Sequence, residues 1–393
     1  GPSVGAKALT LTGAIIIAAI FESAGAIIAG GDVVNTIKSG IIDPNLITDK
    51  NSFIWAMTAG LLAGAVWLNF ATSIGAPVST THAIVGGVMG AGIASAGFSI
   101  LNWGSLVEIA SSWIISPLLG GIVAAGFLYF IKKQIVYKEN MLEQAQKFVP
   151  ILIAIMTWAF TTYLILKGLK QLINIGFYSA SGISILFAIV AYYLTKNSIE
   201  KNLSNLTNDR SSVNKLFTPA LIFGAALLSF AHGANDVSNA IGPLAAINDA
   251  IMHGGTSVQA SVPFWIMFVG AIGIVIGLVL YGPRLIKTVG SEITELDQMR
   301  AFSVAMATAV TVILASQLGL PVSSTHIAIG GVFGVGFLRE ALDMSEKNYV
   351  QDIREKFKKH KKELEKAQAD LAKLEAIKRS EERRVGKECR SRW

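Results

Sequence analysis

The sequence has few charged residues and almost no cysteine. Only 15% of its 393 residues are Asp, Glu, Lys or Arg, and 52% are hydrophobic. Soluble domains carry about 25% charged residues, so a water-soluble protein is disfavoured. The single cysteine, Cys389, excludes an internal disulfide framework. Alternating apolar and polar runs typical of outer-membrane strands are also missing. The composition therefore predicts an integral membrane protein made of helices.

Long apolar runs support this interpretation. Most are close to the roughly 20 residues that a helix needs to cross a bilayer. The runs cover residues 8–31, 53–75, 106–131, 149–169, 183–194, 216–230, 263–281 and 301–318. We expect an all-α, multi-pass bundle in the cell (plasma or inner) membrane, in contact with the lipid bilayer.

The basic excess is concentrated in a few connections. The formal net charge is +7, and much of it lies in residues 132–147, 196–215 and beyond 339. Basic loops between spans lie in the cytoplasm by the positive-inside rule. No aromatic and basic platform accompanies them, so a nucleic-acid partner is not expected.

An internal repeat gives the chain two halves. The stretch "GAPVSTTHAIVGGVMGAG" at 75–92 matches "GLPVSSTHIAIGGVFGVG" at 319–336, with Pro, Ser, Thr and His in the same places. A repeat in a membrane protein favours a transporter whose site lies between the halves. We expect inverted repeats.

The repeat also predicts a division of the chain. "GPSVGAKA" at 1–8 resembles "GPLAAIND" at 242–249, so a counterpart of 233–241 is expected before residue 1. A counterpart of the apolar span 105–131 is likewise expected after the second motif. The predicted regions are a first repeat (1–131), connecting spans and loops (132–215), a second repeat (216–338) and a charged cytoplasmic helical segment without an assigned role (339–393).

The two hydroxyl-rich motifs predict re-entrant hairpins. Proline presets the backbone for a helix start, and the following Ser or Thr is a good N-cap. A helix N-terminus presents free N–H groups and partial positive charge, which favour an anion. Two such ends facing each other would enclose one tetrahedral oxyanion. Alternatively, the hydroxyls bond back to their own helices.

A second polar cluster, Asn235, Asp236 and Asn239, lies in "GANDVSNAIGP". An ionisable group at membrane depth costs at least about 2.5 kcal/mol, so it normally has a partner or a function. With free carbonyls from a helix broken here, the cluster suits Na⁺ or a protonatable carboxylate. A polar helix cap is the alternative. Because Asp236 would repel a divalent oxyanion and the motifs contain no Lys or Arg, the pattern favours co-binding of cation and anion, as in a symporter.

Three other polar residues have several interpretations. His82 and His326 could donate to the anion, carry a proton or brace a hairpin through a carbonyl. Glu22 lies inside an apolar run, where coupling, gating or a structural hydrogen bond would each explain it. The five histidines are too scattered to propose a zinc site.

Together, "GANDVSNAIGP" and the two PVS-[ST]-TH motifs resemble the inorganic phosphate transporter (PiT) family. "IFESAGA" at 20–26 is similar to that family's intramembrane glutamate segment. The resemblance implies an inverted-repeat fold of about 12 spans, of which we expect about ten or more segments here, and a homodimer. It also implies phosphate uptake driven by Na⁺ or H⁺, with no cofactor beyond the coupling ion.

The resemblance assigns roles residue by residue. For phosphate it implies Ser79, Thr80, Thr81, Ser323, Ser324, Thr325, Asn235 and Asn239. For the cation it implies Asp236 and Asn235, with Ser79 and Ser323. The residues expected to act in coupling or gating are Glu22, His82 and His326.

We therefore expect phosphate import by symport with a cation, Na⁺ in the first place. A proton-coupled phosphate or sulfate permease is the alternative, followed by an anion channel or a sensor. An enzyme is not expected, because the sequence has neither a nucleophile–base constellation nor a nucleotide-binding loop.

Overall fold

The computed structural model describes residues 1–390 except 48, 77, 169–174, 203–205, 254–261 and 288–295. Its regular elements in these residues are helices, with one isolated β-bridge between Ile42 and Leu101. Contacts divide the chain into a unit Gly1–Gly336 and a unit Phe337–Trp393. The second unit is the continuation of one helix, α13 (Ser324–Arg390), whose first turns belong to the first unit.

All eight apolar runs of the sequence form helices. In the described part of the chain, eight helices are long and apolar enough to cross a membrane. They are α2 (Leu11–Ala29), α4 (Lys50–Ser73), α6 (Trp103–Ile131), α7 (Met141–Gly168), α8 (Phe177–Asn202), α10 (Thr218–His253), α11 (Phe264–Lys287) and α12 (Gln298–Gln317). The all-α membrane class is confirmed, whereas the number of about ten segments and the inverted relation stay predictions.

Shorter elements connect these helices. They are α1 (Pro2–Gly5), α3 (Gly31–Ser39), α5 (Thr80–Ala96) and α9 (Arg210–Leu216), two 3₁₀ turns at Pro44–Leu46 and Phe98–Ile100, and a π turn at Lys132–Val136. The predicted four-region division of the chain remains a prediction.

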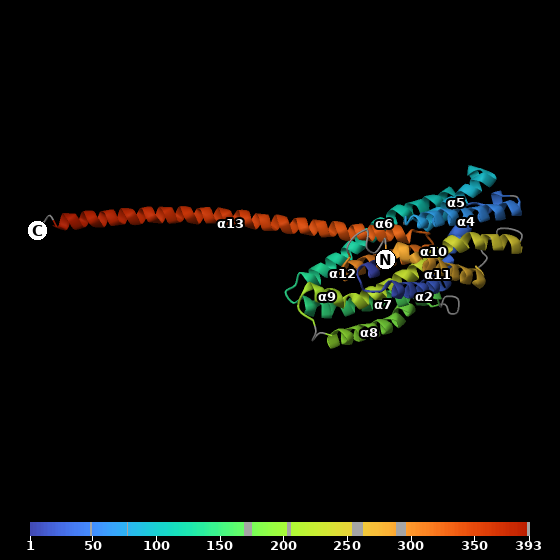
Figure 1. Ribbon diagram of the computed structural model, residues 1–393, viewed down its shortest axis with the longest axis horizontal. Coiled ribbons are helices and arrows are strands. Elements are labelled where there is room, and N and C mark those ends of the chain that lie inside the picture. Colours follow the sequence, from blue (N-terminus) through green and yellow to red (C-terminus); the bar gives the residue numbers. More distant parts are fainter. Residues whose placement is uncertain are drawn as a thin grey trace. The chain divides into compact units, whose positions relative to one another are not determined.

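Helix α10 runs through the middle of the first unit (Figure 1), where it packs against α2, α3, α4 and α12. Its backbone touches that of α2 because both helices have glycine at the crossing. A Cβ on Gly233 would lie 2.0 Å from the carbonyl oxygen of Glu22, and one on Gly25 would lie 2.0 Å from that of Phe230. Side chains larger than hydrogen are excluded at both points. This close approach brings Glu22 beside the polar cluster of α10.

Two helical hairpins supply the hydroxyl motifs. Helices α4 and α5 are joined by the first connection (residues 74–79), and α12 and α13 by the second connection (residues 318–323). The second residue of each is a left-handed glycine, Gly75 at φ 77° and Gly319 at φ 68°. Each ends with a serine that caps the following helix: Ser79 Oγ accepts from the His82 amide at 3.1 Å, and Ser323 Oγ from the His326 amide at 3.2 Å. Pro77 lies outside the described residues.

The expected break in the Asn-Asp motif is wrong. Helix α10 continues through it, with Pro243 inside. The asparagine side chains bond to other elements and do not compete with the helix backbone. Pro243 has no N–H to give to the carbonyl four residues earlier, so a backbone acceptor is released without ending the helix. An interruption does occur elsewhere, at Gly30 between α2 and α3.

Candidate functional site

The two connections meet beside the middle of α10. Thr81 Oγ1, in the first turn of α5, donates to the carbonyl of Val322 in the second connection at 3.0 Å. The rings of His82 and His326 lie edge to face, with centroids 4.9 Å apart. The structure therefore brings the two copies of the motif together, as the sequence predicts for a shared site.

The hydroxyls of the first hairpin face Asn239. The side-chain amide of Asn239 donates to Thr80 Oγ1 at 3.1 Å and to Thr81 Oγ1 at 3.2 Å. Thr81 is fully buried and Ser79 nearly so. Ser79 caps its own helix, whereas Thr81 bonds across to another element. The alternative of local hydrogen bonding thus describes Ser79 but not Thr81.

The second hairpin reaches the carboxylate of the cluster. Ser324 Oγ donates to Asp236 Oδ2 at 3.0 Å. Ser323 caps its own helix, and Thr325 follows on the same turn, half-buried. Both helix N-termini therefore open next to the polar face of α10, where partial positive charge from free N–H groups favours an anion.

Two oxygens of this face remain without a hydrogen-bond partner. Asp236 Oδ1 and Asn239 Oδ1 are buried and unpartnered. They lie three residues apart on α10, so they project from the same side of the helix. A carboxylate and an amide oxygen next to hydroxyl groups are ligands for a hard cation such as Na⁺. The donor set fits such an ion.

Asn235 is used differently. Its amide donates to Ser316 Oγ at 3.0 Å and to the carbonyl of Leu320 at 3.1 Å, and its oxygen accepts from the amide of Val322 at 3.2 Å. The side chain is fully buried. It fastens the second connection to α10. Its predicted role in binding phosphate or the cation stays a prediction.

Sequence reasoning missed His232. Its Nε2 lies 2.8 Å from Asp236 Oδ2, and its Nδ1 lies 3.2 Å from Glu22 Oε1 without the geometry of a hydrogen bond. The imidazole thus stands between two carboxylates that come from α2 and α10. The signal was present, because His232 and Asp236 are four residues apart and hence on one helix face.

One expected role of His82 is to brace a hairpin through a carbonyl; its described side-chain contacts are with other rings. Its ring packs on the indole of Trp113 in α6, with centroids 3.8 Å apart, and its Nε2 has no partner. Trp113 Nε1 donates to the carbonyl of Pro321 at 3.0 Å. Trp113 therefore touches both hairpins, a role that its position in an apolar run did not suggest.

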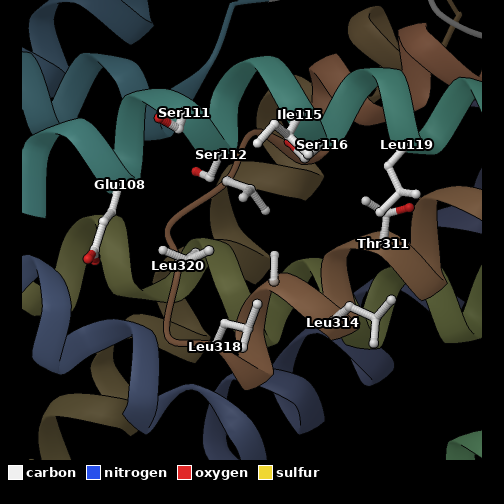
Figure 2. A pocket seen from close by; sticks show the side chains of 12 residues that line it. Glu108, Ser111, Ser112, Ile115, Ser116, Leu119, Thr311, Leu314, Leu318 and Leu320 are labelled. Atoms are coloured by element: carbon white, nitrogen blue, oxygen red, sulfur yellow. The ribbon is translucent and has the colours of Figure 1, made fainter.

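A cavity of about 490 Å³ lies beside the second connection, between α6 and α12. Figure 2 shows Ser112 and Ser116 of α6 on one side of it and Thr311 and Leu314 of α12 on the other. Leu318, Leu320 and Val322 of the connection also line it, and Glu108 is at one end. Its lining is mainly apolar, unlike the polar face of α10. A charged anion would gain little there.

Comparison with known proteins identifies the chain. The model of the phosphate transporter family matches residues 1–367. The chain belongs to the phosphate transporter family. This assigns it to phosphate transport and not to an enzyme class, and with its apolar helices makes it a multi-pass membrane protein.

Individual members of the family are similar over most of the chain. A Helicobacter pylori (strain J99) protein to which phosphate permease activity is attributed is 56% identical over 90% of this chain and 67% of its own length. A Thermococcus kodakarensis protein with the same attribution is 38% identical over 89% of this chain and 86% of its own. A solved structure described as the sodium-dependent phosphate transporter has a TM-score of 0.81 and 34% identity, covering 86% of this chain and 83% of that one.

Proposed function

We propose that this family member imports inorganic phosphate by symport with Na⁺. One observation carries the proposal. The unpartnered oxygens of Asp236 and Asn239 lie beside the N-termini of two hairpin helices, among hydroxyl groups. The site thus offers two kinds of groups side by side. A carboxylate and an amide oxygen suit a cation, and N–H and O–H donors suit an anion. The 34% identical structural neighbour described as sodium-dependent supports Na⁺ as the coupling ion.

Phosphate binds between the two hairpins. Its donors are the hydroxyls predicted from the motifs, together with the first-turn amides of α5 and α13. Ser79, Thr80 and Ser323 accept hydrogen bonds and keep their own O–H to donate to an anion. Thr81 already donates to Val322, whereas Ser324 can turn to phosphate from its bond to Asp236, beside Thr325. Asn239 can donate to phosphate in place of its bonds to the threonines.

The charges explain why cation and anion bind together. Phosphate carries one or two negative charges and Asp236 another, whereas the helix ends supply roughly half a positive charge each. In the described site no Lys or Arg makes up the difference; the buried Lys38 of α3 is paired with Asp249 of α10. Na⁺ at Asp236 Oδ1 and Asn239 Oδ1 removes the repulsion. Binding of either ion then favours the other, which is the thermodynamic basis of coupling.

Proton coupling is the second candidate, and His232 is the observation that favours it. An imidazole between Glu22 and Asp236 can hold or release a proton next to the substrate. In this version, His232 replaces Na⁺ as the group that carries the balancing charge. Glu22 is then a coupling residue through its contact with His232. The expected homodimer stays a prediction.

Uptake of ³²P-phosphate into proteoliposomes tests the two candidates. We expect an inward Na⁺ gradient at equal pH on both sides to drive accumulation, and a pH gradient without Na⁺ to drive little. If the pH gradient alone drove accumulation, the coupling ion would be H⁺ and not Na⁺. Phosphate entry that equilibrates without either gradient would contradict symport and leave a passive pathway. Competition by sulfate at equal concentration measures selectivity in the same preparation.

A further inference from the structure

The second connection is held by four side chains, two of which, Thr36 and Trp113, lie outside the predicted motifs. Each of its carbonyls from Gly319 to Val322 accepts a hydrogen bond from a side chain of a different helix. The donors are Thr36 of α3 to Gly319 at 2.7 Å, Asn235 of α10 to Leu320 at 3.1 Å, Trp113 of α6 to Pro321 at 3.0 Å and Thr81 of α5 to Val322 at 3.0 Å. Carbonyls withdrawn from water need partners, and these four, of which that of Val322 is buried, find them in side chains of other helices.

Trp113 is distinctive among these donors. Its indole N–H bonds to the second connection, and its ring packs at a tilt of 41° against that of His82 in the first hairpin, with centroids 3.8 Å apart. His82 in turn contacts the ring of His326, in the first turn of the second hairpin's helix, edge to face. Trp113 is therefore in contact with both hairpins at the point where they meet, without being next to Asp236 in the sequence or in the hydrogen-bond network.

We propose that Trp113 is a positioning residue for phosphate, fixing the second connection so that Ser324 and Thr325 present their hydroxyls at the site. This inference rests on the proposed function, because it needs phosphate to bind between the hairpins. Ser324 and Thr325 follow Pro321 by three and four residues, and their placement depends on where that connection is held. Without the indole bond, the competent arrangement is populated less, and the apparent affinity falls by the same factor.

The test separates the hydrogen bond from the packing. Trp113→Phe keeps an aromatic face for His82 but removes the N–H together with the five-membered ring, whereas Trp113→Leu removes the aromatic face as well. Replacement by 3-benzothienylalanine, in which sulfur stands for the N–H, is the closest isostere. We expect the Phe and benzothienyl variants to raise the apparent KM for phosphate about ten-fold at unchanged maximal rate per folded transporter, which corresponds to one lost buried hydrogen bond. The Leu variant should raise it further.

Trp158→Phe is the matched control. It also removes an indole hydrogen bond, from Trp158 Nε1 to Ser181 Oγ at 3.1 Å, but between α7 and α8 and away from the hairpins. Its KM should equal that of the wild type. A merely structural role for Trp113 would lower the amount of folded protein and the maximal rate with KM unchanged, and that result would overturn the proposal.

A second readout does not depend on transport. Val322 is fully buried and lines the cavity beside the second connection. In a Cys389→Ser, Val322→Cys background, a maleimide should label Cys slowly, and about ten-fold faster when Trp113 is also Phe. Equal labelling rates would overturn the proposal. If the wild type failed to accumulate phosphate under any gradient, the proposed function would fail, while the labelling rates would still report whether Trp113 holds the connection.

Discussion

The two connections have similar sequences, but their described residues (74–76 and 78–79 in the first, 318–323 in the second) are held in different ways. The second connection is fastened by side chains from four helices, as described for its carbonyls. Just before the first, Arg284 Nη1 of α11 donates to the carbonyl of Ser73, the last residue of α4, at 2.6 Å. Within the first, the amides of Gly75 and Ala76 bond back to Thr72 and Ala71. Similar motif sequences thus give similar turns and helix caps. Hydrogen-bond donors from other helices then determine how firmly each turn is held.

The comparison extends to α10, which serves the hairpins with different residues. Asp236 accepts from Ser324 of the second hairpin, and Asn239 donates to Thr80 and Thr81 of the first. Each of these two residues also has one oxygen without a hydrogen-bond partner, Asp236 Oδ1 and Asn239 Oδ1. The substrate site is therefore asymmetric: a charged acceptor faces one hairpin and a neutral amide the other. Substitutions on the two sides should have unequal effects.

The largest effect is expected at the charged side. Asp236→Asn removes the formal charge that attracts the cation and a charge-assisted bond to Ser324. Each charged hydrogen bond is worth about 1.5–3 kcal/mol, so uptake should fall by roughly 10- to 100-fold. Initial rates of ³²P uptake at saturating Na⁺ measure this. Glu200→Gln, which removes the charge of an ion pair with Lys196 within α8, is the control and should leave uptake unchanged. Normal Na⁺ dependence in the Asp236 variant would contradict the assignment.

The next prediction distinguishes a residue that binds substrate, Asn239, from one that holds the second connection, Asn235. Asn235→Ala leaves the Val322 amide and the Leu320 carbonyl buried without their partner, and each such group costs about 1–3 kcal/mol. Thermal unfolding in detergent should therefore show a clear loss of stability. Asn239→Ala, four residues later, loses bonds only to two hydroxyls and should mainly raise the KM for phosphate. If Asn239→Ala destabilised the protein more than Asn235→Ala, the assignment of roles along α10 would be reversed.

The fold was largely predictable from sequence, and the site was predictable in part. The length of the apolar runs located all eight apolar helices, and the repeat correctly paired the two hydroxyl motifs. Both signals can be read from short contiguous stretches of the chain. The break expected in α10 was wrong because a local count of polar residues ignores tertiary bonds that satisfy them without disturbing the helix. Trp113 could not be found from the sequence, since an indole in an apolar run gives no sign of the carbonyl it will meet. His232 could have been found from its spacing to Asp236.

Alanine at the two left-handed glycines should have a smaller and more equal effect. Gly75 and Gly319 share a positive φ, which costs other residues about 1–2 kcal/mol. A Cβ would lie 3.2 Å from Arg284 Nε at Gly75 and 3.4 Å from Thr36 Oγ1 at Gly319. Similar drops in melting temperature are therefore expected. Transport should suffer more in Gly319→Ala, because Thr36 also holds the carbonyl of that residue. If both variants lost transport equally, the additional hydrogen bonds to the second connection would not matter for transport.

The smallest effect concerns the outer ends of the hairpins, where Asp49 caps α4 and Asp297 caps α12. Burial alone would raise the pKa of Asp297, but hydrogen bonds and ion pairs with Arg300 and Arg210 outweigh it and hold that pKa below the ordinary value. The hydroxyl and amide of Ser52 lower the pKa of Asp49, which is fully exposed. A carboxyl with a lowered pKa in the folded state stabilises the fold above its unfolded pKa of about 3.9. That contribution is lost as the pH falls through the folded-state pKa.

Melting temperatures measured from pH 7 down to pH 3 would compare the two caps. Asparagine keeps the capping oxygen, so Asp297→Asn removes only the charge, and we expect a loss of about 1 kcal/mol at pH 7. The same variant should show a shallower fall in stability below pH 4, because the titrating group is gone. Asp49→Asn should change both quantities less, since solvent screens its charge and no cation of another helix faces it in the contacts described for this residue. A larger change at Asp49 than at Asp297 would show that the second hairpin is not the more firmly anchored of the two at its outer end, and the difference between the hairpins would then be confined to their connections.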